Sequence, residues 1–496
     1  MTNLLRTDGY KFSMAQAGYP LRRERFYFSF RRGGWQYVDL DLKTLVKNLL
    51  PTAPTDLTRT EFEQEADYLA GNNYRLTEAM RETLRGETLV EAVPKGTWIC
   101  NQEPLLTVEA PSFVASQPEA NITMLNYQIQ LTTWLYQWSK AGKEPIKIIN
   151  DEHEAVVRSV FEACGFGLES HPLERIDDEY RQTLDEKVRD IVSALDGGDV
   201  GLRIVEGGLR SAICPEHHRM VLRACAEYGI VRTSNVAGAR EIGRGLIPSG
   251  TAGHEHSQRC GSDRVAYTNY ADRVCGLVSC LADTWSTLDS GLPETIRIAK
   301  KRPERQFLFR LDSGDRASYF MYCANRFKEA GVDNVIINVA GDVNAEMIRK
   351  FEQLRKFADW EPNRLSYMIG GQLTAATLPT DLRRGKVAAV YKLCETGGEP
   401  TMKMGDDVGI GKRSVPGKPT TFRRLRGNGP LSIVGQRGER IEDYVDLFKE
   451  GAWEKIRITN ADAIFNDGKA ADVPVPELTL SPATQALVDQ LVGDAR

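Results

Sequence analysis

The chain of 496 residues lacks long hydrophobic runs and a leader-like beginning. No run approaches the roughly 18 apolar residues that a membrane-spanning helix requires. Met1–Tyr10 has no basic region followed by an apolar segment and a small-residue cleavage site, which is the pattern of a secretory signal. We therefore expect a cytoplasmic protein.

Cysteine motifs and a strong charge of either sign are absent as well. The nine cysteines include no C-x-x-C pair and are odd in number, so neither a disulfide framework nor a zinc site is indicated. The 64 basic residues nearly balance the 68 acidic ones, and the net charge is −4. This balance excludes a global attraction to nucleic acid, so any anion-binding site must be local.

What is present is the composition of a folded protein, with 41% apolar and 27% charged residues. The length exceeds one ordinary core, which predicts two domains or a large barrel with an appended domain. Alternating aromatics predict a strand at Arg23–Arg32, a β-rich stretch covers 88–110, and apolar spacing predicts a helix at Asn121–Trp138. Residues 1–140 are therefore expected to form an α+β domain.

The sequence pattern changes in the middle of the chain, from predicted helices to strands that alternate with helices. Two amphipathic helices with an acidic link are predicted within 141–200, which we interpret as a solvated insertion without a direct catalytic role. Over 201–395, short apolar strands alternate with helical stretches, which predicts parallel βα units in an open sheet or a barrel. Residues 396–496 show mixed strand and helix patterns. The clearest strands are Gly229–Ser234, Leu277–Asp283, Gln306–Asp312, Asn334–Ala340, Leu365–Ile369 and Val387–Leu393.

Polar clusters follow these strands, where a barrel places its reactive groups. Arg310 and Asp312 close one strand, and such a pair can hold a planar carboxylate and a divalent cation, or can be a structural ion pair. Gly341 and the pair Gly370-Gly371 end the next two strands. Glycines there let phosphate oxygens approach backbone amides at a helix N-terminus. Together they predict a phosphate site.

A further cluster, Gly250–His256, places two of the six histidines beside Thr251 and Glu255. A histidine in such a place can act as a nucleophile or carry a proton near neutral pH. Metal binding is less favoured, because two histidines at i, i+2 in a glycine-rich loop lack the helical spacing of zinc hydrolases. Purely structural histidines are the other alternative.

Motifs over most of the chain follow one another in a specific order and spacing. The motifs are Thr7–Lys11, Phe30-Arg31, Pro94–Thr97, Glu103–Leu106, Leu125–Gln128, Glu206–Arg210, Thr233–Gly238, Gly250-Thr251, His254-Glu255, Asp283-Thr284, Arg310–Asp315, Gly341-Asp342, Val390–Leu393 and Lys412–Lys418. Together they resemble nicotinate phosphoribosyltransferases and, more distantly, nicotinamide phosphoribosyltransferases. The resemblance implies an irregular α/β barrel of the type II phosphoribosyltransferase kind, with an α+β domain built from the N-terminal and C-terminal segments. It also implies a homodimer with composite active sites.

The activity implied by the resemblance joins nicotinate to the phosphoribosyl group of 5-phosphoribosyl 1-pyrophosphate, with ATP hydrolysis, in NAD biosynthesis. Tyr10, supplied by the partner subunit, would stack on the pyridine ring. Arg310 would face the carboxylate of nicotinate, with Thr251 beside the base. Arg210 is a further candidate for contact with a phosphate or the carboxylate.

The remaining roles follow from the same resemblance. Asp283 and Asp312 would hold the ribose and the magnesium pyrophosphate. The 5′-phosphate would rest on Gly341, Gly370 and Gly371. Mg²⁺ and the co-substrate ATP are therefore implied, without an organic prosthetic group.

Two histidines and one serine leave alternatives open. His254 matches the histidine that ATP phosphorylates, but His256 is a rival, because nicotinamide-specific relatives carry Glu-His-Ser as at Glu255-His256-Ser257. Ser234 favours nicotinate, because those relatives place there an acid that accepts amide hydrogens, whereas a serine does not repel a carboxylate. An inactive barrel scaffold would require loss of the charged groups, which are retained. An aldolase-like enzyme would need a Schiff-base lysine, for which Lys392 is the candidate.

Overall fold

The computed structural model describes residues 3–52, 57–138, 145–167, 172–404, 414–452, 455–456, 475 and 477–494. Lys412 and Arg413, the start of one motif of the resemblance, lie outside the described residues. Within the described residues, no helix is both long enough and apolar enough to cross a membrane.

Seven parallel strands form the larger sheet, in the order β10-β9-β8-β14-β13-β12-β11. The sheet curls into a half-barrel, which confirms the predicted α/β class. It does not close within the described residues, since β10 and β11 are its two edges. β10 has only two residues, one of them a proline without an N–H to donate. The strands are β8 (Ile204–Glu206), β9 (Arg232–Thr233), β10 (Ile247–Pro248), β11 (Val278–Leu281), β12 (Phe307–Leu311), β13 (Val335–Val339) and β14 (Leu365–Ile369).

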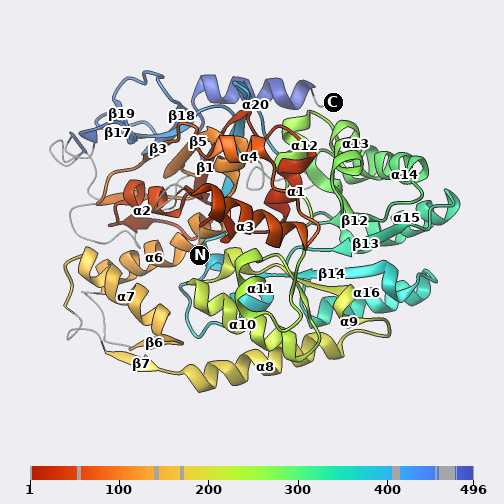
Figure 1. Ribbon diagram of the computed structural model, residues 1–496. Helices are drawn as coiled ribbons and strands as arrows, with labels where there is room; N and C mark the ends of the chain where they lie inside the picture. Colours follow the sequence, from red (N-terminus) through yellow and green to blue (C-terminus); the bar gives the residue numbers. More distant parts are fainter. Residues whose placement is uncertain are drawn as a thin grey trace.

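Helices that follow these strands, such as α10, α14, α15 and α16, lie on the outside of the half-barrel (Figure 1). Their starts are set by capping side chains: Asn344 accepts a hydrogen bond from the backbone N–H of Met347, and Asp315 accepts one from that of Ser318. The helices are α9 (Val200–Arg203), α10 (Pro215–Glu227), α11 (Val236–Ile242), α12 (His254–Cys260), α13 (Asp263–Arg273), α14 (Leu292–Lys301), α15 (Arg316–Glu329), α16 (Ala345–Phe357), α17 (Gly371–Thr374) and α18 (Arg384–Val387), with the short turns η3 (Leu209–Ser211), η4 (Ala282–Thr284), η5 (Thr287–Gly291) and η6 (Pro362–Arg364).

The second sheet is antiparallel, in the order β16-β15-β1-β5-β3. The strand predicted at Val387–Leu393 belongs here and not to the parallel sheet: β15 pairs antiparallel with β1, with Lys392 opposite Tyr27. Its apolar pattern indicated a strand correctly but carries no information on its partner or direction. The strands are β1 (Arg23–Phe30), β3 (Leu89–Ala92), β5 (Leu106–Pro111), β15 (Ala389–Thr396) and β16 (Glu399–Pro400).

Further elements complete the fold around the two sheets. The helix predicted at Asn121–Trp138 is confirmed as α6, and the two helices predicted within 141–200 are confirmed as α7 and α8. The helices are η1 (Asn3–Leu5), α1 (Tyr10–Ala17), α2 (Leu42–Leu49), α3 (Arg59–Ala70), α4 (Glu78–Thr83), α5 (Ser112–Ser116), α6 (Glu119–Trp138), α7 (Asp151–Ala163), α8 (Asp177–Ser193) and α20 (Pro482–Asp494). Small sheets contain β2 (Gln36–Val38) with β4 (Thr97–Ile99), β6 (Ile146–Ile148) with β7 (Leu173–Arg175), and β17 (Pro419–Arg424) with β18 (Ser432–Gln436) and β19 (Tyr444–Asp446).

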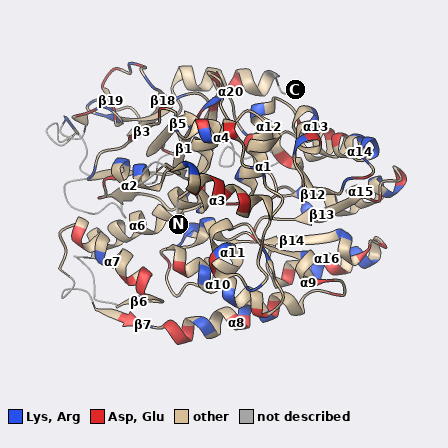
Figure 2. Ribbon diagram, in the orientation of Figure 1, with Lys and Arg blue, Asp and Glu red and all other residues tan. Residues whose placement is uncertain are grey.

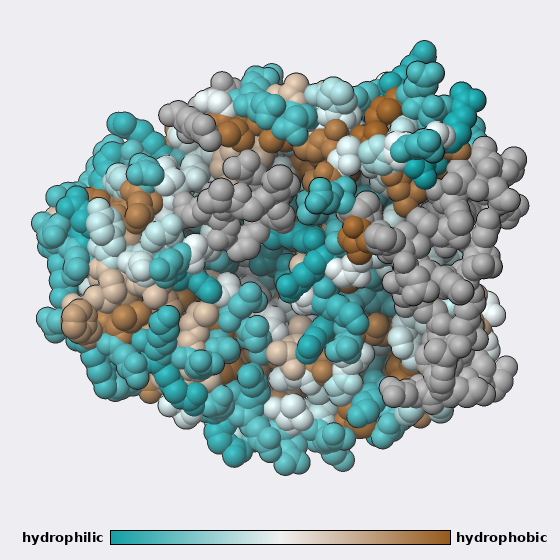
Figure 3. Space-filling model, turned by 180° about the vertical axis from the view of Figure 1, so that it is seen from behind, coloured by the Kyte–Doolittle hydropathy of each residue, from teal (hydrophilic) through white to brown (hydrophobic). Residues whose placement is uncertain are grey.

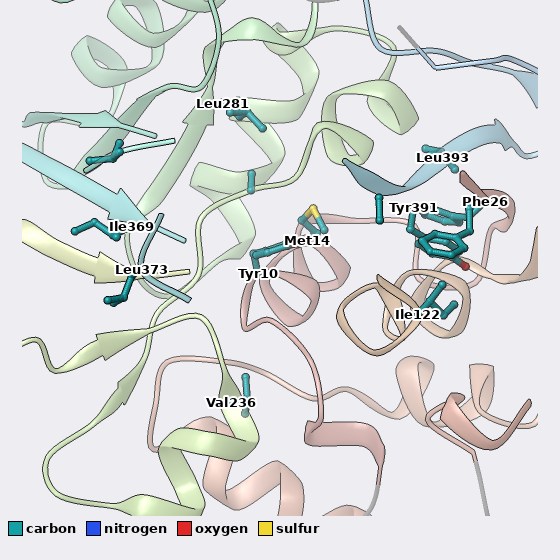
Figure 4. Packing of buried hydrophobic residues seen from close by; sticks show 14 of the residues in the cluster. Tyr10, Met14, Phe26, Ile122, Val236, Leu281, Ile369, Leu373, Tyr391 and Leu393 are labelled. Carbon is teal, nitrogen blue, oxygen red and sulfur yellow. The ribbon is translucent and has the colours of Figure 1, made fainter. Parts of the chain in front are cut away.

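One continuous hydrophobic core joins the two sheets. Phe26 and Tyr391 stack in the antiparallel sheet, with ring centroids 4.9 Å apart. Leu281 and Ile369 lie at the parallel sheet, and Tyr10 of α1 lies between the two groups (Figure 4). The helix α1 is therefore packed where the two sheets meet.

In the view of Figure 2, neither charge dominates the described part of the outer surface. Basic and acidic residues alternate along outer helices such as α8 and α16 (Figure 2). Seen from behind, apolar residues lie scattered among hydrophilic ones (Figure 3). Any concentration of charge for anion binding must therefore be sought inside the fold.

Candidate active site

A cavity of about 770 Å³ lies between the carboxyl ends of the parallel strands and the elements α1, α6 and β15. Two predicted site residues, Thr251 and Asp283, do not line the cavity themselves but contact the lining residues Arg310 and Lys403. The others line it directly: Tyr10, Arg210, Ser234, His254, Arg310, Asp312, Gly341, Gly370 and Gly371. Residues that are far apart in the sequence are thus brought to one place.

Arg310 and Asp312 form a paired group at the end of β12. The guanidinium donates to Thr251 Oγ1 at 2.8 Å and to Asp312 Oδ1 at 2.7 Å. Burial alone would raise the pKa of Asp312, but Arg310 and Lys403 hold that pKa well below its usual range. Asp312 is therefore an ionised carboxylate in the cavity.

His254 is the first residue of α12 and is held by two hydrogen bonds. Its Nε2 lies 2.9 Å from Lys403 Nζ, and its Nδ1 lies 3.1 Å from Thr284 Oγ1. Because an ammonium group can only donate, Nε2 is the accepting nitrogen, and in the neutral ring Nδ1 carries the proton. Burial and Lys403 lower the pKa of His254. The geometry thus presents a neutral imidazole with a basic Nε2.

Two carboxylates flank this nitrogen. His254 Nε2 lies 3.8 Å from Asp283 Oδ1 and 3.9 Å from Asp312 Oδ2. The three side chains offer ligand atoms within 4.8 Å of one another, and Asp283 Oδ1 has no hydrogen-bond partner among the described residues. Carboxylate oxygens are the donors that Mg²⁺ prefers, so the two acids fit this ion in donor type.

His256, the rival of His254, does not line the cavity. It is 2% exposed and its Nε2 donates to the carbonyl oxygen of Ala266 at 3.1 Å. Burial lowers the pKa of His256 to about 4. The structure thus places His254, and not His256, at the cavity.

The glycines at the strand ends allow close packing of the turns. Gly341 has φ +74°, and a Cβ there would lie 2.7 Å from the backbone oxygen of Asp312. A Cβ at Gly370 would lie 3.0 Å from the oxygen of Gly207. Larger residues would push neighbouring turns apart at the edge of the cavity.

A buried ionic group supports Tyr10. Its Oη donates to Glu119 Oε2 at 3.0 Å, and Lys11 Nζ lies 2.5 Å from both Glu119 and Glu255. Arg210 contacts the other oxygen of Glu119 at 3.0 Å. Tyr10 lines the cavity of its own chain. Supply of this ring by a second subunit, which the resemblance implied, stays a prediction.

Ser234 has an acidic neighbour that the sequence pattern did not indicate. Its hydroxyl donates to Asp8 Oδ1 at 2.6 Å, and both residues line the cavity. The argument that position 234 lacks an acid is therefore incomplete, because Asp8 brings a carboxyl group to the same spot.

A basic side of the cavity, formed by Arg31, Arg384, Lys392 and Lys403, was largely missed from the sequence. Arg31 and Lys392 belong to motifs of the resemblance but had no anion-binding role, and Arg384 and Lys403 belong to none. Burial and the nearby Arg31 lower the pKa of Lys392 to about 7. Isolated basic residues carry no local pattern, so only the fold reveals this cluster.

Comparisons with known proteins test the resemblance inferred from the sequence. No family model matches the chain. The chain is 30% identical over 246 residues to the nicotinate phosphoribosyltransferase of Bacillus subtilis, covering 48% of this chain and 44% of that protein. It is 29% identical over 188 residues to the human protein of the same name, covering 36% and 32%. The resemblance to nicotinate phosphoribosyltransferases is confirmed. The matched regions span less than half of these relatives.

Solved structures extend the likeness to the fold. The nicotinate phosphoribosyltransferase from Porphyromonas gingivalis has a TM-score of 0.57 at 19% identity, covering 84% of this chain and 96% of that chain. That from Vibrio cholerae has a TM-score of 0.54 at 16% identity, covering 81% and 88%. The chain thus has the fold of nicotinate phosphoribosyltransferases.

Proposed function

We propose that the chain transfers the phosphoribosyl group of 5-phosphoribosyl 1-pyrophosphate to nicotinate, forming nicotinate mononucleotide and pyrophosphate. The observation that carries the proposal is the convergence of a paired Arg310–Asp312, a neutral His254 and a basic side in one cavity. Relatives with this printed name match the chain over a third to a half of its length. The cavity volume of about 770 Å³ suits a nucleotide-sized pair of substrates.

Nicotinate would bind between Tyr10 and Arg310. Tyr10 is fixed by its bond to Glu119, so its ring can stack on a planar base without losing much freedom. Arg310 is buried, and its Nε has no hydrogen-bond partner among the described residues. A guanidinium with an unused donor suits a carboxylate.

The phosphate groups would lie against the basic side and the glycine turns. Arg31, Arg384, Lys392 and Lys403 offset the charge of a pyrophosphate, and the turn at Gly341 leaves room for the 5′-phosphate. Mg²⁺, held by Asp283 and Asp312, would neutralise further charge on the pyrophosphate.

In the transfer, the pyridine nitrogen forms a bond to the ribose C1 as the bond from C1 to the pyrophosphate oxygen breaks. Pyrophosphate leaves with the electron pair of that bond. Positive charge develops at the ribose in the transition state, and the ionised Asp312 is placed to stabilise it.

ATP would act through His254. Its Nε2 attacks the terminal phosphorus of ATP, ADP leaves, and water later cleaves the phosphohistidine to inorganic phosphate. Lys403, 2.9 Å from Nε2, is placed to offset the charge of the phosphoryl group. A homodimer is part of the proposal, although one chain supplies every lining residue named above.

Nicotinamide is a second candidate base, favoured by one observation. The carboxyl group of Asp8 touches Ser234, and an ionised carboxylate accepts the N–H groups of an amide.

The test incubates the protein with 5-phosphoribosyl 1-pyrophosphate, Mg²⁺ and either base, with and without ATP, and measures mononucleotide and pyrophosphate. Nicotinate mononucleotide, increased by ATP, is the expected product, and His254→Ala should abolish the ATP effect. Product from nicotinamide alone would transfer the proposal to that base. No product from either base would refute both.

A further inference from the structure

Asp8 is a cavity residue with a hydrogen bond on one carboxyl oxygen only. It is 2% exposed, and Oδ1 accepts from the Ser234 hydroxyl at 2.6 Å. Oδ2 has no partner among the described residues. The backbone fixes the position, since Gly9 N–H donates to the Ser234 oxygen at 2.7 Å and Asp8 bridges to Asn235. The unpartnered oxygen is therefore held in place.

A buried carboxyl oxygen without a partner is unfavourable, so a ligand atom is expected to complete it. The possible partners differ with protonation. An ionised Asp8 can only accept and would select an amide, whereas a protonated Asp8 donates its O–H and would select a carboxylate. The state of this single group therefore distinguishes the two candidate bases.

We propose that Asp8 is a specificity-determining residue, which donates its Oδ2–H to the carboxylate of a pyridine carboxylate while the Ser234 hydroxyl occupies Oδ1. This inference rests on the proposed function for the identity of the base. According to this inference, the selectivity for nicotinate depends on Asp8 together with Ser234, and not on Ser234 alone.

The surroundings of Asp8 support a proton on it. Burial raises the pKa of Asp8, and Glu119 adds to this, while Arg210, Ser234 and Lys11 oppose it. Tyr10 and Tyr74 also face the group. A bound nicotinate carboxylate would raise the Asp8 pKa further, because two carboxyl groups in contact share one proton. Binding of the anion should then take up a proton.

The sign of the pH dependence follows. Nicotinate binding requires protonated Asp8, so the KM for nicotinate should be low at acidic pH and should rise as pH increases above the Asp8 pKa of the free protein. Asp8→Asn keeps the shape, offers its amide oxygen to Ser234 and donates an N–H to the carboxylate. This variant should keep the KM for nicotinate within about threefold of wild type at low pH and remove its pH dependence.

Asp8→Ala is the matched variant without a donor. Loss of a hydrogen bond to a charged group should raise the KM for nicotinate about 10- to 100-fold. The KM for 5-phosphoribosyl 1-pyrophosphate should stay unchanged, which a merely structural role would not explain. Thermal melting of both variants checks that each is folded.

Calorimetry separates this inference from the proposed function. Nicotinate alone is titrated into the protein in buffers of different ionisation enthalpy, so that proton uptake is measured without turnover. The titration is repeated over a range of pH; wild type should take up a proton, approaching one where free Asp8 is ionised, and Asp8→Asn none. If wild type shows this uptake but forms no mononucleotide, the proposed function fails and the inference stands. It is overturned if binding takes up no proton at any pH while the KM for nicotinate rises with pH, if Asp8→Asn weakens nicotinate as much as Asp8→Ala, or if nicotinamide binds more tightly and Asp8→Asn weakens it.

Discussion

The two sides of the cavity are built differently. The parallel-sheet side presents acids, hydroxyls and glycines at consecutive strand ends, as with Asp312 after β12 and Gly341 after β13. The antiparallel-sheet side presents mostly cations from separate segments, such as Arg31, which directly follows β1, and Lys392 of the neighbouring strand β15. One side is suited to the ribose and a divalent ion, and the other to phosphate charge.

This difference has a functional consequence. The side with strand-end turns is positioned by backbone packing, where shifts of a few tenths of an ångström matter. The basic side acts through charge, which falls off slowly with distance in a buried cavity. Substitutions on the first side should therefore reduce catalysis more than single neutralisations on the second.

The largest loss is expected from Asp312→Asn. Removing the carboxylate that we propose stabilises the reacting ribose should lower kcat/KM by about 10²- to 10³-fold, with mononucleotide formation as the measurement. Asp315→Asn is the matched control on the same turn: it only caps α15 and is exposed. That variant should keep activity and lose at most about 1 kcal/mol of stability. Equal losses in the two variants would contradict a special role for Asp312.

An intermediate loss is expected from Lys403→Met on the basic side. The substitution removes the donor to His254 Nε2 and the 3.0 Å contact with Asp283. A charged hydrogen bond of this kind contributes about 1.5–3 kcal/mol, so ATP-stimulated turnover should fall roughly 10- to 100-fold. Basal turnover without ATP should fall less. A variant that loses both to the same extent would show that Lys403 does not act through His254.

The difference between the two sides of the cavity also explains which site residues the sequence could predict. Arg310, Asp312 and Gly341 follow apolar strands directly, so a local pattern locates them and the parallel topology brings them together. Lys403 and Asp8 have no such pattern, because their roles arise from contacts with residues over a hundred positions away. The direction of β15 was also beyond prediction, since the apolar pattern of a strand is the same in either orientation. Pairing across 360 residues is decided by the assembled core.

A smaller effect should follow Gly341→Ala. A Cβ at this position would lie 2.7 Å from the backbone oxygen of Asp312, and the alanine would have to adopt a φ of +74°. The KM for 5-phosphoribosyl 1-pyrophosphate should rise about tenfold, because the turn near the phosphate must move. Gly331→Ala is the matched control, with φ +65° and nothing within 4 Å of its Cβ. It should cost about 1 kcal/mol of stability with unchanged kinetics. The difference between the two isolates the contact with Asp312.

The smallest effect on catalysis is expected at His256, beside the proposed phosphorylation site. Because its side chain lies outside the cavity lining, His256→Gln should keep activity within about threefold while retaining a donor to Ala266.

Stability should respond instead. Burial lowers the pKa of His256 to about 4 in the folded state, whereas an unfolded histidine has about 6.5. The unfolded state therefore binds more protons between these values, and folding stability falls as pH drops from about 6.5 to about 4. The slope of the unfolding free energy against pH reflects the number of protons taken up on unfolding. His256→Gln should lower that number by up to one in this pH range. His153 has a similarly lowered pKa and should keep part of the slope. Chemical denaturation at several pH values measures the slope, and a large loss of ATP-stimulated activity in this variant would reinstate His256 as the phosphorylated residue.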